Sequence, residues 1–218
     1  MTTMNLATSQ DAAIDLLRRA RILPVVTVER AADAVAVARA LLGGGLPVIE
    51  LTLRTPAALD AIAAVKRDVP GIAVGAGTVL SAAQVAQARA AGADFLVTPG
   101  TPPALAQALA DSGLPAVPGA ATPTELLALA ACGFRVCKLF PAAAVGGLAL
   151  VRALRAPLAG TLLCPTGGIG EDDAAQYLAE PNVACVGGSW MVRPEWIAGG
   201  RVDAIRDATA RACSTAAR

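Results

Sequence analysis

The chain has 218 residues, and its 18 basic and 17 acidic residues give a net charge of +1, which offers no electrostatic footprint for nucleic acid or an anionic membrane. It contains no histidine, which excludes Ser-His-Asp and Cys-His catalysis and every metal site with an imidazole ligand. Hydrophobic residues make up 55% and aromatic residues 3%, so we expect a core of small aliphatic side chains. Any acid–base chemistry must fall to carboxylates, lysine, tyrosine, cysteine or water.

The expected compartment is the cytoplasm. Apolar stretches are broken by Gly, Pro or charge before they reach the roughly 18 residues of a membrane span. The N-terminal segment carries acidic residues early and has no continuous apolar run, so it is unlike a secretory signal. The cysteines are odd in number and form no CxxC pair, which favours buried, unpaired thiols over disulfides or a metal site. They are Cys132, Cys137, Cys164, Cys185 and Cys213.

Short apolar runs alternate with Ala-rich segments of helical periodicity along the chain. A helix is expected first, over roughly residues 9–20. Eight runs typical of strands follow, at residues 22–28, 47–53, 71–77, 94–100, 114–120, 134–140, 161–168 and 183–189. They recur every 20 to 27 residues or so, which leaves room for one strand, one helix and two short loops.

Runs that are apolar on both faces suit parallel strands covered by helices. The pattern therefore predicts an α/β chain folded as a single (β/α)8 TIM-barrel domain over residues 1–218, with residues 1–20 as a helical cap at the bottom of the barrel. A doubly wound open sheet is the alternative, and the first run lacks the GxGxxG turn that such a sheet often carries.

Lys138 lies between an apolar run and a proline in FRVCKLFPA, and it is one of only two lysines among the 18 basic residues. A desolvated lysine can lose its proton and form a Schiff base, whereas arginine stays charged. The other lysine, Lys66, follows a helical segment, where a cation interacts well with the helix dipole. Lys138 is therefore the candidate nucleophile, with a surface lysine as the alternative.

Glu50 interrupts the apolar run PVIELTL, and an acid in such a strand is rarely buried without a partner or a function. The alternative is an ion pair with Arg54, but four residues on a strand span about 13 Å, so the loop would have to curl back. Functional residues of a parallel barrel collect at the C-terminal ends of its strands. Two separate roles for Glu50 and Arg54 at that rim are therefore favoured.

Two glycine pairs, Gly167–Gly168 and Gly187–Gly188, follow the seventh and eighth runs. Backbone amides exposed by small residues at the start of a helix can bind a phosphate, and barrels commonly place a phosphate site in these two loops. Ser189 would add a hydroxyl donor. Tight turns also require glycine, so the pairs favour a phosphate site without proving one.

Six segments, PVIELTLRTP, VGAGTVL, FLVTPG, CKLFPA, CPTGGI and VGGSW, occur in this order. Together they resemble the signature segments of the 2-keto-3-deoxy-6-phosphogluconate (KDPG) aldolase family, class I aldolases that also include 4-hydroxy-2-oxoglutarate (KHG) aldolases. The resemblance covers roughly residues 22–196. It implies an aldehyde-lyase of the Entner–Doudoroff pathway that cleaves KDPG to pyruvate and D-glyceraldehyde 3-phosphate, needs no metal or other cofactor, and assembles as a homotrimer.

The same resemblance implies Lys138 as the Schiff-base lysine and Glu50 as the acid–base residue. The residues implied to bind the pyruvyl part or line its pocket are Arg54, Thr78, Pro99, Phe140 and Thr166. The residues implied to bind the phosphate are Gly167, Gly168, Gly188 and Ser189. The match supplies no basic partner for the phosphate, and Arg21 is the candidate for that role.

Two alternatives stay open. The substrate could be 4-hydroxy-2-oxoglutarate or 2-dehydro-3-deoxy-6-phosphogalactonate, because these share the pyruvyl half and differ only at the far end of the pocket. The chain could also be a barrel that binds a sugar phosphate without catalysis. Lys138, Glu50 and Arg54 argue against this second alternative, since a binding protein needs no imine-forming lysine.

Overall fold

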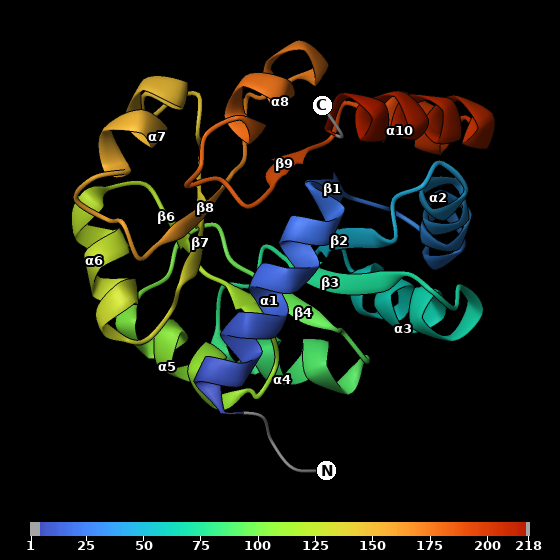
Figure 1. The fold of residues 1–218 in the computed structure, drawn as a ribbon. Coiled ribbons are helices and arrows are strands. Elements are labelled where there is room, and N and C mark those ends of the chain that lie inside the picture. Colours follow the sequence, from blue (N-terminus) through green and yellow to red (C-terminus); the bar gives the residue numbers. More distant parts are fainter. Residues whose placement is uncertain (1–4, 217–218) are drawn as a thin grey trace.

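The structure, a computed structural model, describes residues 5–216 and is an α/β fold of parallel strands surrounded by helices (Figure 1). The strands are β1 (Ile22–Val26), β2 (Val48–Thr52), β3 (Ala73–Gly77), β4 (Phe95–Val97), β5 (Ala116–Val117), β6 (Gly119–Ala120), β7 (Val136–Leu139), β8 (Leu162–Pro165) and β9 (Val186–Gly188). The helices are α1 (Leu6–Ala20), α2 (Ala31–Gly43), α3 (Ala58–Asp68), α4 (Ala82–Ala90), α5 (Pro103–Asp111), α6 (Pro123–Ala131), α7 (Gly147–Leu154), α8 (Glu171–Leu178), α9 (Pro194–Ala198) and α10 (Val202–Ala216).

Every strand lies inside one of the eight predicted runs, and all pairings are parallel. The fifth run gives two short strands, β5 and β6, because Pro118 between them has no N–H group to give to a neighbouring strand. The strands form one sheet in the order β5-β4-β3-β2-β1-β9 and a second in the order β6-β7-β8. The first order lacks the reversal that defines a doubly wound sheet, so that alternative is wrong.

The two sheets meet at two junctions. At one, the chain itself passes from β5 through Pro118 into β6. At the other, parallel bridges join Leu163 to Val183 and Thr166 to Gly187, which connects the edge of β8 to the strand that ends in β9. Strands of both sheets are almost entirely buried, as expected for strands covered on their outer face by helices.

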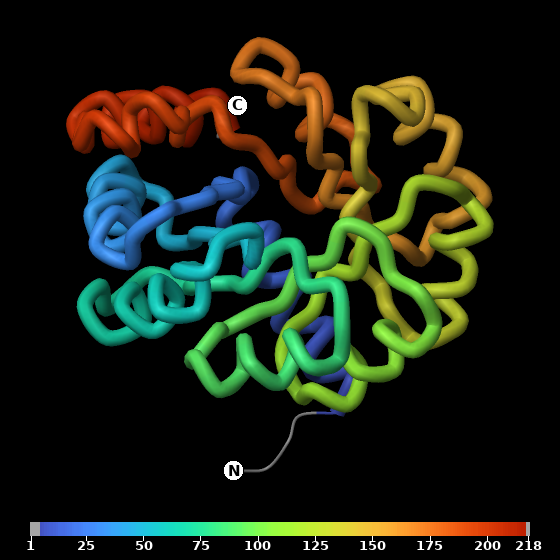
Figure 2. Tube along the Cα trace, turned by 180° about the vertical axis from the view of Figure 1, so that it is seen from behind, coloured from blue at the N-terminus to red at the C-terminus, as the bar shows by residue number. Residues whose placement is uncertain are grey.

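Helix α1 crosses the N-terminal ends of the strands (Figure 1). Its residue Gln10 is fully buried and uses its amide twice: Nε2 donates to the carbonyl of Ala116 (2.8 Å), and Oε1 accepts from the backbone N–H of Arg135 (2.9 Å). The predicted cap spanned residues 1–20, of which residues 1–4 lie outside the described part of the chain. The opposite side, seen in Figure 2, carries the C-terminal ends of the strands and the loops that follow them.

Within residues 5–216, no helix is long and apolar enough to cross a membrane.

Candidate active site

Lys138 on β7 and Glu50 on β2 meet between the two sheets. The Lys138 Nζ donates to Glu50 Oε1 at 3.2 Å, and the two side chains are only 5% and 1% exposed. The strand register places Lys138 beside Gly119 of β6 and Cys164 of β8, and it places Glu50 beside Gly75 of β3. An amine and a carboxylate 88 residues apart in sequence thus form one buried pair.

Both alternatives for these residues are wrong. Lys138 is buried, whereas a surface lysine would be solvated. Glu50 pairs with Lys138 and not with Arg54, whose residue is exposed just beyond β2. Lys66 behaves as expected of a surface lysine, because it lies at the end of α3 and forms a half-exposed ion pair with Asp94.

The second carboxylate oxygen of Glu50, Oε2, is buried and has no hydrogen-bond partner among residues 5–216. A buried, unpaired acceptor is unusual and costs free energy. Oε2 is therefore available to accept a proton from a molecule bound next to Lys138, while Oε1 stays hydrogen-bonded to the Lys138 amine.

Glycine at position 77 leaves the space that the Glu50 carboxylate occupies. An ideal Cβ on Gly77 would lie 2.2 Å from Glu50 Oε1 and 2.7 Å from its Cδ. Gly77 is paired with Thr52 in the β2–β3 ladder, so its backbone cannot retreat without breaking that ladder. The GAG segment that the sequence places in the third run therefore has a steric function in this site.

The residues predicted to line the pyruvyl pocket lie at the same end of the strands. The Phe140 ring lies under the Lys138 amine, whose Nζ is 5.4 Å from the ring centroid. Thr166 follows β8 and is buried, and its hydroxyl donates to the carbonyl of Cys164 (3.2 Å). Thr78 follows β3 with a left-handed φ of 55°, and Pro99 follows β4 half-buried.

The predicted phosphate loops are adjacent, because the bridge from Thr166 to Gly187 joins the ends of β8 and β9. Gly167 and Gly168 have left-handed φ values of 96° and 74°, which side chains rarely adopt. Beyond the bridge, a Cβ on Gly188 would lie 1.8 Å from the Trp190 ring. Packing between Gly188 and Trp190 is a feature of this loop that the sequence interpretation did not include, although VGGSW contains both residues.

Arg21 is not placed to bind a phosphate at these loops. It precedes β1, and its guanidinium donates to the carbonyls of Ala216 and Leu178, both at 3.3 Å, which are the last residues of α10 and α8. These contacts lie at the N-terminal end of β1, where Ile22 pairs with Val186, while Gly188 pairs with Pro24. The prediction for Arg21 is wrong, and a cation at two helix C-termini explains the residue instead.

The five cysteines are free, and three of them, Cys137, Cys164 and Cys185, are buried as predicted. Burial raises the pKa of the Cys137 thiol to about 12. A hydrogen bond from Cys185, helped by the positive charge of Lys138, lowers the pKa of Cys164, whereas burial raises that of Cys185 well above its ordinary value. Cys213 is half-buried, and Cys132 is exposed, contrary to the expectation for buried thiols.

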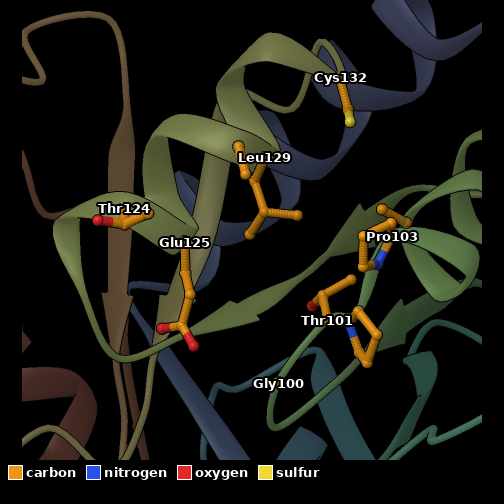
Figure 3. A pocket seen from close by; sticks show the side chains of 10 residues that line it. Gly100, Thr101, Pro103, Thr124, Glu125, Leu129 and Cys132 are labelled. Atoms are coloured by element: carbon orange, nitrogen blue, oxygen red, sulfur yellow. The ribbon is translucent and has the colours of Figure 1, made fainter.

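Cys132 lies at the end of α6 and lines a surface pocket of about 480 Å³ between α5 and α6. In Figure 3, Thr101 and Pro103 lie on one side of this pocket and Glu125 and Leu129 on the other. Most of its lining is apolar. The predicted catalytic and binding residues do not line it, so it is separate from the Lys138–Glu50 site.

Among residues 5–216, no group of three or more His, Cys, Asp or Glu side chains is arranged to hold a metal ion. Beside the Lys138 amine and the Glu50 carboxylate lies the buried thiol of Cys164, the strand neighbour of Lys138 on β8. A buried amine paired with a carboxylate is the minimal equipment for imine chemistry: the amine is the nucleophile, and the carboxylate moves protons.

Comparison with known proteins places the chain in a family. The sequence profile of the KDPG and KHG aldolases matches residues 13–208. The 2-dehydro-3-deoxy-phosphogluconate aldolase of Pseudomonas aeruginosa is 46% identical over 182 residues, which are 83% of this chain and 83% of that protein. The protein of the same name from Treponema pallidum is 45% identical over 186 residues, which are 85% and 89% of the two chains.

Among solved structures, KDPG aldolase from Legionella pneumophila, with pyruvate captured at low pH as a covalent carbinolamine intermediate, superposes with a TM-score of 0.89. The two chains are 37% identical, and the match covers 91% of this chain and 96% of the other. Together with the profile match and the two bacterial relatives, this shows that the chain belongs to the KDPG and KHG aldolase family.

Proposed function

We propose that this chain is a class I aldolase, an aldehyde-lyase that cleaves 2-dehydro-3-deoxy-6-phosphogluconate to pyruvate and D-glyceraldehyde 3-phosphate. The observation that carries the proposal is the buried pair of Lys138 Nζ and Glu50 Oε1 at 3.2 Å, in a chain that belongs to a family of such aldolases. The bacterial relatives named above carry the name of this aldolase, and the reaction gives a role to both the Lys138 amine and the Glu50 carboxylate.

Imine formation begins at Lys138. Glu50 accepts a proton from the ammonium group, and the free amine attacks the C2 ketone of the substrate to give a carbinolamine. Glu50 then returns its proton to the carbinolamine hydroxyl, which leaves as water, so that Glu50 is again a carboxylate and a protonated imine remains between Nζ and C2. This imine withdraws electrons from the neighbouring carbons. The Phe140 ring under the amine excludes water and stabilises positive charge on the nitrogen.

Carbon–carbon cleavage needs a base for the C4 hydroxyl. Glu50 accepts that proton, with its unpartnered Oε2 as the free acceptor. The C3–C4 bond breaks, its electrons move into the imine, and glyceraldehyde 3-phosphate leaves as the aldehyde. Glu50 gives the proton it accepted to C3 of the enamine that remains, and water hydrolyses the resulting imine to pyruvate and free Lys138.

The binding residues divide between the two ends of the substrate. Arg54, exposed at the end of β2, binds the pyruvyl carboxylate through its guanidinium, and the hydroxyls of Thr78 and Thr166 add hydrogen bonds. Pro99 and Phe140 form the apolar walls. At the other end, the backbone of four residues and one hydroxyl hold the phosphate: Gly167, Gly168, Gly188 and Ser189.

The exact aldehyde partner is a finer proposal within the same chemistry. The family profile covers both KDPG and KHG aldolases, so 4-hydroxy-2-oxoglutarate and the galactonate epimer are the competing substrates. Cleavage rates on the three substrates decide among them, and we propose that KDPG has the highest kcat/KM. A sugar-phosphate-binding barrel without catalysis would leave the burial of Lys138 next to Glu50 without a purpose.

We also propose that the strands form a closed eight-stranded (β/α)8 barrel in one domain over residues 1–218, with the segment 1–20 as its cap. The bridges from β8 to β9 and the continuous chain from β5 to β6 support closure on both sides. By the same family relationship, we propose a cytoplasmic homotrimer that acts in the Entner–Doudoroff pathway.

The test is covalent trapping. Incubation with pyruvate and borohydride should inactivate the protein and add one pyruvate-derived adduct per chain, mapped to the peptide containing Lys138. Lys138→Arg should not be labelled, because a guanidinium does not act as an imine nucleophile at neutral pH, while the control Lys66→Arg should be labelled fully. A label on Lys66, or no label on the wild-type chain, would overturn the proposal.

A further inference from the structure

Two threonine hydroxyls connect the sheet that carries Glu50 to the sheet that carries Lys138. The backbone N–H of Gly119 donates to Thr98 Oγ1 at 2.8 Å, the hydroxyls of Thr98 and Thr101 are 2.7 Å apart, and Thr101 Oγ1 donates to the carbonyl of Gly119 at 2.9 Å. Since the Thr101 proton is used on that carbonyl, Thr98 must be the donor between the two hydroxyls. The three bonds form a closed ring around Gly119.

This ring lies where the backbone ladder stops. The sheet that contains β2 ends at β4–β5, where the backbone N–H of Thr98 reaches the carbonyl of Val117 only at 3.4 Å. Beyond Pro118, strand β6 belongs to the other sheet and is bonded to β7. On its other side, both backbone groups of Gly119 are satisfied by the two threonine side chains instead of by a strand.

Gly119 is also the strand neighbour of Lys138. The two residues are paired in register, and the N–H groups of Lys138 and Phe140 donate to the carbonyls of Pro118 and Ala120 at 2.9 Å and 3.0 Å. An ideal Cβ on Gly119 would lie 2.4 Å from the carbonyl oxygen of Thr98, so only glycine permits this close approach. The position of Lys138 relative to β4 is therefore set through Gly119.

We propose that Thr98, together with Thr101, is a positioning residue that fixes the distance between Lys138 and Glu50. The hydrogen bonds that join Thr98 and Thr101 to Gly119, here called the Thr98–Thr101 clamp, hold β6 against the end of β4. Strand β6 in turn pairs with β7, which carries Lys138 toward Glu50 on the other sheet. Thr98 is fully buried, and its hydroxyl bonds to Thr101 and to the Gly119 N–H and not to either of these two side chains, so it acts through the backbone. This role deepens the proposed function and depends on it for its catalytic consequence.

The first test uses Thr98→Val, which keeps the side chain's shape but leaves the Gly119 N–H without an acceptor, and Thr98→Ser, which restores the hydroxyl. The readout is exchange of the pyruvate C3 protons with deuterated water, which needs both imine formation at Lys138 and proton transfer. We expect Thr98→Val to slow exchange about tenfold at saturating pyruvate, less than the roughly 10²-fold cost of a 1 Å displacement, with KM little changed and Thr98→Ser close to wild type. The control is Thr209→Val, which removes a buried hydroxyl bonded to Ile205 in α10.

The second test does not depend on activity. Backbone amide hydrogen exchange in peptides covering residues 116–121 and 134–140 should be faster in Thr98→Val than in wild type, and unchanged in Thr209→Val. Unchanged amide exchange, or full pyruvate exchange in Thr98→Val, would overturn the role of the clamp. A wild-type chain that borohydride and pyruvate do not label would instead overturn the proposed function, and the amide measurement would still decide whether the clamp holds β6.

Discussion

Gly77→Ala tests whether the position of Glu50 is fixed by the space that glycine leaves. The added Cβ would lie 2.2 Å from Glu50 Oε1 and 2.6 Å from Glu50 Cγ, whereas ordinary contacts begin at 3.4 Å. Either the carboxylate or strand β3 must therefore move by about 1.2 Å, the difference between 3.4 and 2.2 Å. The ladder from β2 to β3 opposes movement of the strand, so the carboxylate is the part that gives way.

The magnitude follows from that displacement. A misplacement of about 1 Å costs about 10²-fold in rate, and removal of acid–base catalysis altogether costs roughly 10²–10⁴-fold. We expect kcat for KDPG cleavage to fall by about 10²-fold in Gly77→Ala, with a stability cost of about 1–3 kcal/mol from overpacking. Because Lys138 keeps its own position on β7, labelling by pyruvate and borohydride should persist.

The assay follows pyruvate release with lactate dehydrogenase and NADH, beside a thermal melt of each variant. Gly160→Ala is the matched control, since an ideal Cβ there meets nothing within 4 Å and its φ lies outside the left-handed region. We expect the control to keep its full activity. A folded Gly77→Ala protein with more than half of the wild-type kcat would refute the reasoning, because Glu50 would then be either tolerant of displacement or unnecessary.

Glu50→Gln should still be labelled by pyruvate and borohydride while cleavage falls by about 10²–10⁴-fold, and full cleavage would make Glu50 a structural partner only. Activity should be unchanged by EDTA, and a loss restored by magnesium or manganese would contradict the imine mechanism. A thiol-titrating disulfide reagent should find one fast cysteine, Cys132, absent from Cys132→Ser; fast reaction of Cys137 in the folded protein would contradict its burial. The raised pKa of Cys137, about 12 against an ordinary 9.0, favours the protonated folded state, so its contribution to stability is complete below pH 9 and is lost as pH rises from 9 to 12. Over that range, the free energy of unfolding measured in urea should fall by up to about 1.4 kcal/mol per pH unit more in wild type than in Cys137→Ala. Equal dependence of the two free energies on pH would be contrary evidence.

The strands could be predicted from the sequence because each is buried on both faces and therefore reads as a continuous apolar run. The division of the fifth run into β5 and β6 could also have been predicted, since Pro118 has no N–H group to donate to a neighbouring strand. The pairing between sheets could not be predicted in this way. It depends on bridges such as Thr166 to Gly187, which are single contacts that leave no periodic pattern.

The sequence was sufficient to predict that the candidate site lies at the C-terminal ends of the strands. Lys138 and Glu50 both stand out as charged residues in apolar runs, and parallel strands bring their C-terminal ends together. The failure for Arg21 has a physical reason that the sequence already contained: the residue precedes the first run, so it belongs at the N-terminal end of β1, opposite the phosphate loops. A positive charge alone was therefore not enough to assign Arg21 to the phosphate, whereas its position before the strand would have excluded it.

The site's geometry results from the way two sheets meet. Glu50 is carried by the six-stranded sheet and Lys138 by the three-stranded sheet, so no continuous ladder of backbone hydrogen bonds fixes their separation. Gly77 fixes the carboxylate within its own sheet, whereas Thr98 and Thr101 fix the neighbour of Lys138 across the junction. Gly77→Ala and Thr98→Val therefore displace opposite members of the same pair, and their effects on proton exchange should be non-additive, because both act on the one distance of 3.2 Å between Lys138 and Glu50.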